Sequence, residues 1–247
     1  MTQPTEVPKE EFLQSVRRSL GRTAGPPETP YPLLGDTTAD LLDQIGEARQ
    51  RIEMARPQLM DQLARVAAQR DWNVHRAQNP EDAIGYILSL ASRLGIEQIV
   101  RSSQEVFRQV PLDTALAAHG VSLTVAALEA GGDRESVRAA IIEAGIGITG
   151  ADYAVAETGS VVLLPQKGLS RLASVVPPVH VALVRPEDVV DTLDDVFLMR
   201  RLDYHQNSGD MGSYLNFITG PSRTADIEQT LVIGVHGPRE VHMVLLG

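Results

Sequence analysis

The stretch WNVHRAQNPEDAIGYILSLASRLGIEQIVR, residues 72–101, decides the fold class. Residues 72–75 have the short pattern of a strand, and residues 80–94 repeat apolar side chains at helical spacing, with two acids in the first turn. Gly95 is a typical helix end, and the apolar pair 99–100 begins another strand. The stretch therefore predicts a strand–helix–strand unit.

The same alternation continues along the chain. Further strands are predicted over 121–125 and 146–149, and helices over 112–118 and 134–144. Strands and helices that alternate in this way form a mostly parallel, buried sheet. The later strands are expected over 160–164, 179–184, 215–219, 231–235 and 241–246, with one helix over 186–202. The predicted fold class is α/β, with an open, mostly parallel sheet covered by helices.

The first 70 residues have a different pattern. After a polar tail they contain a short amphipathic helix over 9–20, a proline-rich linker and a long helical stripe over 40–70. Pro57 lies inside this stripe and predicts two consecutive helices, because proline lacks the backbone donor. We therefore expect an N-terminal helical extension over 1–70 and an α/β domain over 71–247. A flexible extension and an arm that packs on a partner both fit the first segment.

Composition excludes several classes of function. Of the 247 residues, 32 are acidic and 22 basic, and the net charge of −10 disfavours nucleic-acid binding. The chain has no cysteine, which excludes disulfides, thiolate zinc sites and iron–sulfur clusters held by cysteine. The six histidines have no metal-ligand spacing, and the common nucleotide-binding motifs are missing. No metal and no cysteine-bound cofactor are expected, and the other cofactors stay open.

The apolar runs of the chain are too short to span a bilayer. The N-terminus MTQPTEVPKEEF has neither an apolar segment nor a basic leader, so it is not expected to be a signal peptide. These features predict a cytoplasmic protein.

Chemistry is first suggested by ITGADYAVAETGSVVLL, residues 148–164. Glu157, Thr158, Gly159 and Ser160 place a carboxylate and two hydroxyls beside a glycine, directly before a strand. Glycine allows the backbone to bend and expose its amides to a ligand. A tight turn in which the hydroxyls bond their own backbone explains the same residues.

Two cations follow this motif. Lys167 and Arg171 are predicted to lie in a loop between two apolar strands, where they would neutralise a carboxylate or phosphate. Solvation, or pairing of Arg171 with a nearby acid, is the alternative. Pro177 and Pro178 precede the next strand, and a cis bond there is left open.

The C-terminal block FITGPSRTADIEQTLVIGVHGPREVHMVLL, residues 217–246, contains two glycine turns. In the first turn, Ser222 or Thr224 can cap a short helical turn that carries Asp226, and the free amides and hydroxyls there can bind an anion. Capping alone would also account for the hydroxyls. The second turn supplies a histidine that titrates near neutral pH. Because ligands of open α/β sheets lie at the carboxyl ends of strands, we expect both turns there, sharing a pocket with the ETGS turn. The candidate residues are Gly220, Ser222, Arg223, Thr224, Asp226, His236 and Gly237.

Three motifs together resemble the LUD-domain family: GITGADYAVAETGSVVLLP, the segment from Arg171 to His180 with its PP-x-H, and TGPSRTADIE with GVHGPREVHMVLL. The resemblance covers roughly residues 70–247. It implies a fold similar to the glucosamine-phosphate deaminase, ribose-phosphate isomerase and CoA-transferase group. It also implies a role in oxidising L-lactate to pyruvate, with two partner proteins that carry iron–sulfur clusters.

The missing cysteines make this chain the cluster-free member of such a system. Our leading hypothesis is a subunit that binds a small anion between the ETGS, GPSRT and GVHGP turns, with Glu157 or His236 transferring a proton. One alternative is a stand-alone enzyme acting on a phosphosugar or CoA ester, with Glu157 as nucleophile or base. The other is a non-catalytic scaffold or regulatory subunit.

Overall fold

The computed structural model describes residues 8–21, 36–127, 133–165, 170–210, 212, 214–225 and 230–247. It divides into two compact units, residues 1–37 and residues 38–247. In the first unit, α1 (Lys9–Ser19) is an amphipathic helix without a buried residue. The second unit contains the remaining helices and strands of the described residues.

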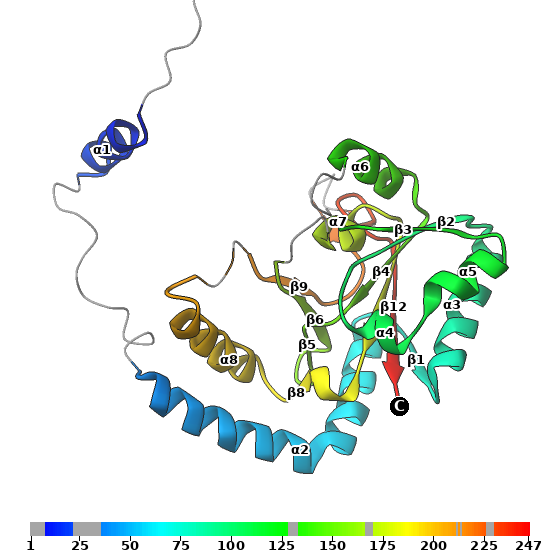
Figure 1. The fold of residues 1–247 in the computed structure, drawn as a ribbon, viewed down its shortest axis with the longest axis horizontal. Coiled ribbons are helices and arrows are strands. Elements are labelled where there is room, and N and C mark those ends of the chain that lie inside the picture. The colour runs from blue at the N-terminus through cyan, green and yellow to red at the C-terminus, as the bar shows by residue number, and fades with distance from the viewer. Residues whose placement is uncertain are drawn as a thin grey trace, which may run out of the picture. The chain divides into compact units, whose positions relative to one another are not determined.

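A six-stranded parallel sheet forms the centre of the second unit (Figure 1). Its strand order is β1-β12-β7-β4-β2-β3. The strands are β1 (Asn73–Ala77), β2 (Gln98–Arg101), β3 (Ser122–Val125), β4 (Ile146–Gly150), β7 (Val179–Val184) and β12 (Glu240–Leu246). The last strand of the chain thus lies between the first strand and β7. The predicted open, parallel α/β sheet is confirmed.

A second, smaller sheet has the order β8-β5-β6-β9. Strands β5 (Tyr153–Val155) and β6 (Ser160–Leu163) form an antiparallel hairpin, flanked by β8 (Val189–Val190) and β9 (Asn216–Ile218). A two-stranded antiparallel ribbon joins β10 (Arg223–Thr224) to β11 (Val232–Ile233). The close spacing of strands after residue 150 therefore reflects separate sheets.

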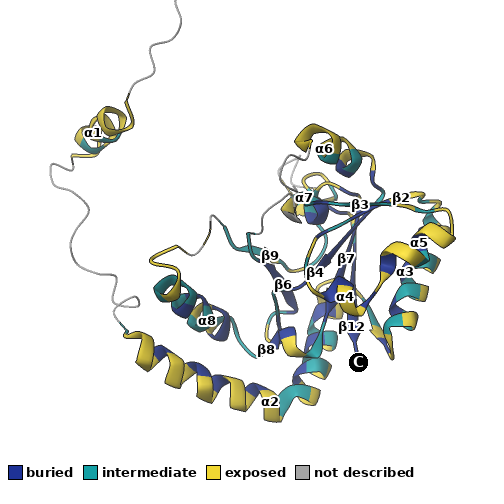
Figure 2. Cartoon of the chain, in the orientation of Figure 1, coloured by how far each residue is buried: buried dark blue, intermediate teal, exposed yellow. Residues whose placement is uncertain are grey.

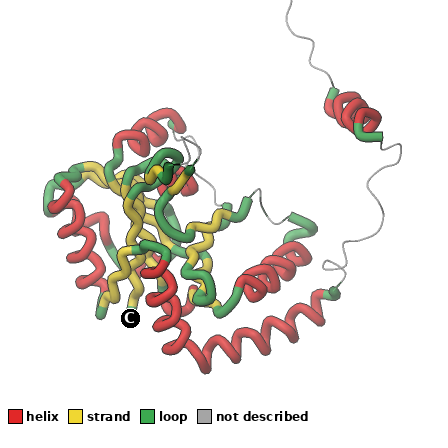
Figure 3. Tube along the Cα trace, turned by 180° about the vertical axis from the view of Figure 1, so that it is seen from behind, coloured by secondary structure: helices red, strands yellow, loops and turns green. Residues whose placement is uncertain are grey.

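Helices cover both faces of the large sheet, as Figures 1 and 3 show from opposite sides. Helices α3 (Pro80–Leu94), α4 (Val106–Gln109) and α5 (Leu112–Ala118) pack on one face. Helix α2 (Thr38–Gln69), α8 (Leu193–Gln206) and the small sheet pack on the other. Helices α6 (Arg134–Glu143) and α7 (Ser170–Val175) pack near β2, β3 and β4.

Burial on both faces explains the continuous apolar runs in the sequence. On β12, Val241, Met243 and Leu245 face the core beneath α2. Val244 and Leu246 alternate with them and face the core beneath α3. Because both faces of such a parallel strand are buried, its sequence is a nearly continuous run of hydrophobic residues. Figure 2 shows these strands as dark blue, buried ribbon.

Two expectations for the helices are wrong. Residues 38–69 form one helix, α2, with Pro57 inside it, rather than two. Figures 1 and 3 show α2 bending along its length, so the chain accommodates the missing proline donor with a bend instead of a break. The helix expected over 186–202 begins only at Leu193. Residues 186–188 form a 3-10 turn, η2 (Pro186–Asp188), followed by β8, and the Thr192 side chain caps α8.

Within the described part of the chain, every helix is too short or too polar to cross a bilayer.

Candidate functional site

The ETGS turn joins β5 to β6 and contacts the first C-terminal turn directly. The Thr158 hydroxyl donates to Ser160 Oγ at 2.8 Å, and Ser160 Oγ lies 2.8 Å from Thr219 Oγ1. Ser160 is buried, with 3% of its surface exposed. A chain of three hydroxyls therefore ties this hairpin turn to the segment that enters the GPS turn.

The two C-terminal turns also contact each other. The amide of Ser222 donates to the carbonyl of Pro238 at 2.8 Å, and the amide of Gly234 donates to the carbonyl of Ser222 at 2.9 Å. A Cβ atom at Gly237 would lie 3.3 Å from Ser222 Cβ. The structure thus brings the ETGS, GPSRT and GVHGP turns together, and we call these three turns the turn cluster.

The turn cluster lies at the amino ends of the large sheet's strands. The GVHGP turn directly precedes β12, and Arg239 donates its amide to the carbonyl of Pro178, which directly precedes β7. The expectation that these turns stand at the carboxyl ends is therefore wrong. The reason is connectivity: a turn that leads into a parallel strand lies at that strand's start.

Two glycines of the cluster accommodate the end of α2. Gly159 has φ +69°, and a Cβ atom there would lie 2.7 Å from the Ala67 amide nitrogen. Gly220 has φ +129°, and its Cβ would overlap the Arg70 carbonyl oxygen. Both positions need glycine because of backbone conformation and close approach to α2. Their roles in this structure are thus those of packing residues.

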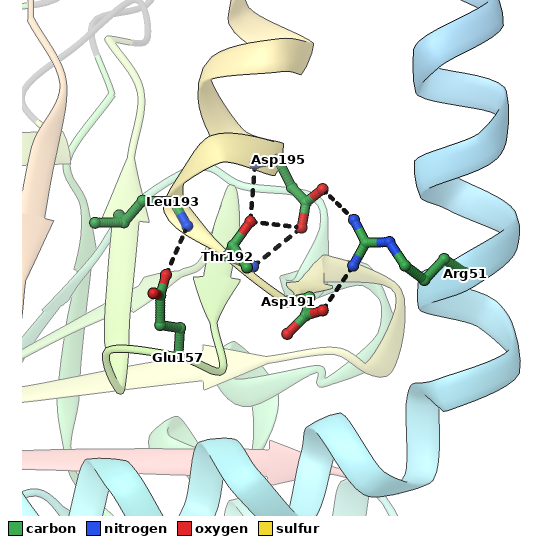
Figure 4. Close-up of polar contacts among 6 residues, drawn as sticks. All are labelled: Arg51, Glu157, Asp191, Thr192, Leu193 and Asp195. Atoms are coloured by element: carbon green, nitrogen blue, oxygen red, sulfur yellow. Dashed lines mark hydrogen bonds and ion pairs between the residues drawn. The ribbon is translucent and has the colours of Figure 1, made fainter.

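Glu157 is an exposed residue whose carboxylate accepts a hydrogen bond from the Leu193 amide at 3.2 Å (Figure 4). Leu193 is the first residue of α8, where unpaired amides favour a carboxylate. The candidate nucleophile or base is therefore engaged at a helix terminus.

Beside Glu157, the start of α8 is held by an ion-pair network (Figure 4). Thr192 and Asp195 form a reciprocal capping box. Arg51 of α2 contacts Asp195 and Asp191, each at 2.6 Å. The Asp195 side chain is 5% exposed and that of Arg51 is 48% exposed, so this network links α2 to α8 at a partly buried point.

The other predicted residues, including Arg223, Thr224 and His236 of the turn cluster, have separate surroundings. Arg223 pairs with Asp71, the residue two positions before β1, and His236 is exposed. Arg171 lies in α7 rather than in a loop, with its guanidinium carbon 5.5 Å from the centre of the Tyr214 ring. Thr224 pairs with Val232 in the β10–β11 ribbon instead of capping a helix. Lys167 and Asp226, with the helical turn expected around Asp226, lie outside the described residues.

A cleft of about 1010 Å³ opens at the opposite, carboxyl edge of the large sheet. Its walls follow the ends of four strands. Lining residues include Arg101 at the end of β2, Val125 at the end of β3, and Asp152 and Arg185, which follow β4 and β7. We call this the carboxyl-edge cleft.

The cleft occupies the point where the order of the strands reverses. From β2 the chain crosses to β3, on one side, whereas from β4 it crosses to β7, on the other side. Strands β2 and β4 are neighbours, so the loops after them diverge and leave a crevice. Open α/β sheets bind their ligands at such topological switch points.

Gln104 spans this crevice. Its amide oxygen accepts from the Ser102 hydroxyl at 2.6 Å and from the Gly150 amide at 2.7 Å. Its amide nitrogen donates to the Asp152 carboxylate at 3.1 Å. Asp152 also accepts from the amide of Leu164 at 2.8 Å. The loops after β2 and β4 are therefore fastened to each other.

Two arginines at the cleft are held in fixed orientations by carboxylates. Arg101 makes a two-pronged contact with Asp113, with both distances 2.8 Å, and its guanidinium lies 4.7 Å from the centre of the Phe107 ring. Arg185 makes a similar contact with Asp188, at 2.9 and 2.6 Å. The hydrogen bond to Asp188 raises the pKa of Arg185, which keeps that guanidinium charged.

Four residues at this cleft were not among those predicted from the sequence: Arg101, Gln104, Asp152 and Arg185. The signal that was available is their position: each is polar and stands at, or within three residues after, the end of an apolar strand. The predicted site was based on the three glycine-containing turns instead. Parallel strands share one carboxyl edge, so residues that follow different strands converge there.

The large sheet also buries two histidines. His180 is fully buried, and burial lowers its pKa to about 3. Its Nε2 lies 2.9 Å from the Thr149 hydroxyl. His242 lies 2.7 Å from the Tyr86 hydroxyl, and burial lowers its pKa as well. Both rings are therefore neutral packing groups near pH 7.

Among the described residues, no three histidine or acidic side chains are grouped so that they could hold a metal ion.

The fold has a solved counterpart. A DUF162 family protein from Deinococcus radiodurans aligns with 78% of this chain and 98% of its own, with a TM-score of 0.54 and 18% sequence identity. The likeness supports the assignment of the α/β fold.

Sequence comparison assigns the family. The LUD domain profile matches residues 60–246, and the chain therefore belongs to the LUD domain family. A lactate utilization protein C from Halalkalibacterium halodurans is 31% identical over 237 residues, which cover 93% of this chain and 94% of that protein. A lactate utilization protein C from Bacillus licheniformis is 28% identical, with 96% and 95% covered. The predicted membership of the LUD-domain family is confirmed.

Proposed function

We propose that this chain is the cysteine-free subunit of a system that oxidises L-lactate to pyruvate. The observation that carries the proposal is the similarity to lactate utilization protein C along nearly the whole length of both chains. Similarity of that extent includes the helical segment α2 and the LUD domain together.

The partners in this proposal are proteins that carry iron–sulfur clusters. Oxidation of lactate to pyruvate releases two electrons, which need a redox carrier. This chain has no thiolate with which to hold such a cluster. Its contribution is therefore the binding and presentation of an organic anion, and the electrons pass through the partners.

The competing enzyme hypothesis requires Glu157 as a nucleophile or base for a CoA ester or phosphosugar. The contact of Glu157 with the Leu193 amide gives this carboxylate a structural role at α8. No described contact favours the nucleophile over that role, so we retain the lactate-utilisation proposal alone.

The test is growth on L-lactate. A strain deleted for the gene of this chain is expected to lose growth on L-lactate, to keep growth on glucose, and to recover with the wild-type chain. Equal growth of the deleted strain on L-lactate would contradict the proposal.

The predicted anion site in the turn cluster is tested in the same strain with the double variant Ser222→Ala, Thr224→Ala. Loss of growth at a normal protein level would support an anion site at these turns. Full rescue would argue that their hydroxyls serve packing.

A further inference from the structure

We propose that the carboxyl-edge cleft, rather than the turn cluster, is the ligand-binding site, and that its ligand is an organic anion that carries a carboxylate or a phosphate. The inference deepens the proposed function, on which it rests for the metabolic role of the ligand. The cleft's geometry supports it independently.

Arginine side chains are the first feature of the cleft that points to an anion. Three arginines and two acids line the cleft: Arg101, Arg108 and Arg185, with Glu105 and Asp152. Each of the three arginines is paired with a carboxylate: Arg101 with Asp113, Arg108 with Glu105 and Arg185 with Asp188. The cleft therefore offers an anion guanidinium groups in fixed positions rather than an unpaired excess of positive charge.

Arg185 and Arg101 keep hydrogen-bond donors for a ligand. A guanidinium has five N–H donors, and Arg185 uses its Nε and Nη2 on Asp188, while its Nη1 lies 3.4 Å from Glu187. The contacts of Arg101 use three donors, two on Asp113 and one on the Ser102 carbonyl. Each side chain keeps N–H groups beyond those contacts. Carboxylates and phosphates match the planar fork of arginine.

The polar side chains of the cleft are already ordered. Arg101 and Arg185 are fixed by carboxylates, and Gln104 fastens the two loops between which a ligand would enter. A site that is already ordered spends little binding free energy on immobilising side chains. Ser103, an exposed lining residue, adds a hydroxyl at the same place.

The volume favours a ligand larger than lactate. About 1010 Å³ lies at the upper end of the range typical of ligand pockets, whereas lactate has only six non-hydrogen atoms. An anion with an apolar or extended portion would use the wall formed by Val106, Phe107, Val125 and Ala127.

The experiment is isothermal titration calorimetry on the full-length chain with four probes: L-lactate, pyruvate, inorganic pyrophosphate and ADP. The first two represent carboxylates and the last two phosphates. The expected result is saturable binding of at least one probe. Failure of all four to bind below about 10 mM would overturn the proposal.

Variants locate the site. Arg101→Ala is expected to weaken binding at least about ten-fold, as is Ser103→Trp, which fills the cleft without removing a charge. Asp113 is 54% exposed on its side chain, so water can solvate it once Arg101 is gone. Arg76→Ala is the matched control, because Arg76 forms an exposed ion pair with Asp61 outside the cleft.

The results with these variants distinguish a ligand site at the carboxyl-edge cleft from one at the turn cluster. Binding that resists Arg101→Ala and Ser103→Trp, or that is abolished by Ser222→Ala with Thr224→Ala, would overturn the cleft assignment. The two proposals can also fail separately. If ligand binding depends on Arg101 but the deletion strain grows normally on L-lactate, the cleft assignment stands and the proposed function is rejected.

Discussion

Gln104 Nε2 donates a hydrogen bond to the carboxylate of Asp152 at 3.1 Å, across the gap between the loops that follow β2 and β4. The two residues are 48 positions apart in the sequence. The amide oxygen of Gln104 also accepts a hydrogen bond from the Gly150 amide. One side chain therefore links the two loops that diverge at the topological switch point of the sheet.

Replacing Gln104 by Ala should therefore destabilise the protein. The Gly150 amide and the Ser102 hydroxyl lose their acceptor, and unsatisfied polar groups of this kind cost about 1–3 kcal/mol each when buried. Urea unfolding at neutral pH measures the loss. Gln98→Ala, at an exposed position of β2, the strand that precedes Gln104, is the control, and an equal effect of both substitutions would refute the role given to Gln104.

Alanine at Gly159 or Gly220 should cost more. Each residue has positive φ. The added Cβ at Gly159 meets backbone atoms of Ala67 in α2, and the added Cβ at Gly220 meets the carbonyl of Arg70, directly after α2. We expect at least about 2 kcal/mol of lost stability, or loss of folded protein, measured by thermal unfolding. Gly85→Ala in α3 is the matched control, because a Cβ there meets nothing within 4 Å and helix propensity rises. Unchanged melting of both turn variants would show that the α2 contact is not as close as described.

His180 should make stability fall in mild acid. Its pKa is about 3 in the folded chain and 6.5 for an ordinary histidine, so between these values only the unfolded chain binds the proton. Stability from this residue is complete above about pH 6.5 and is lost as the pH falls, by about 2 kcal/mol at pH 5. Urea unfolding at pH 7.5 and pH 5 measures it. His180→Gln, which can keep the bond to Thr149, should flatten this dependence, whereas exposed His119→Gln should not. Identical pH dependence of His180→Gln and the wild type would refute the account.

Glu157→Gln should have a small effect. The carboxylate is exposed and contributes one hydrogen bond at the start of α8, where Thr192 and Asp195 already form a capping box. We expect less than about 1 kcal/mol of lost stability and full rescue of growth on L-lactate. A normally folded variant without any rescue would restore Glu157 as a catalytic candidate.

Features of the fold that depend on local sequence patterns could be predicted from the sequence, whereas features that depend on the tertiary arrangement could not. The helix over 80–94 and the strands over 121–125 and 179–184 were predictable, because local periodicity and caps define them. The start of α8 was missed because Pro186 also begins a 3-10 turn, so the true cap is Thr192.

The site was harder to predict for a physical reason. A glycine in a turn has the same sequence signal whether it exposes amides to a ligand or accommodates a helix, and Gly159 and Gly220 do the second in this structure. The edge at which a turn lies depends on strand order, which no local pattern contains. The convergence of Arg101, Asp152 and Arg185 at one cleft likewise follows from that order.

The central claim is that this chain serves lactate oxidation through the carboxyl-edge cleft. The most direct measurement is the rate of L-lactate consumption by the deletion strain carrying Arg101→Ala, compared with strains carrying the wild type and Arg76→Ala at equal protein levels. We expect Arg101→Ala to lower the rate to about a tenth or less of the wild-type rate and Arg76→Ala to leave it unchanged. A wild-type rate with Arg101→Ala would contradict it.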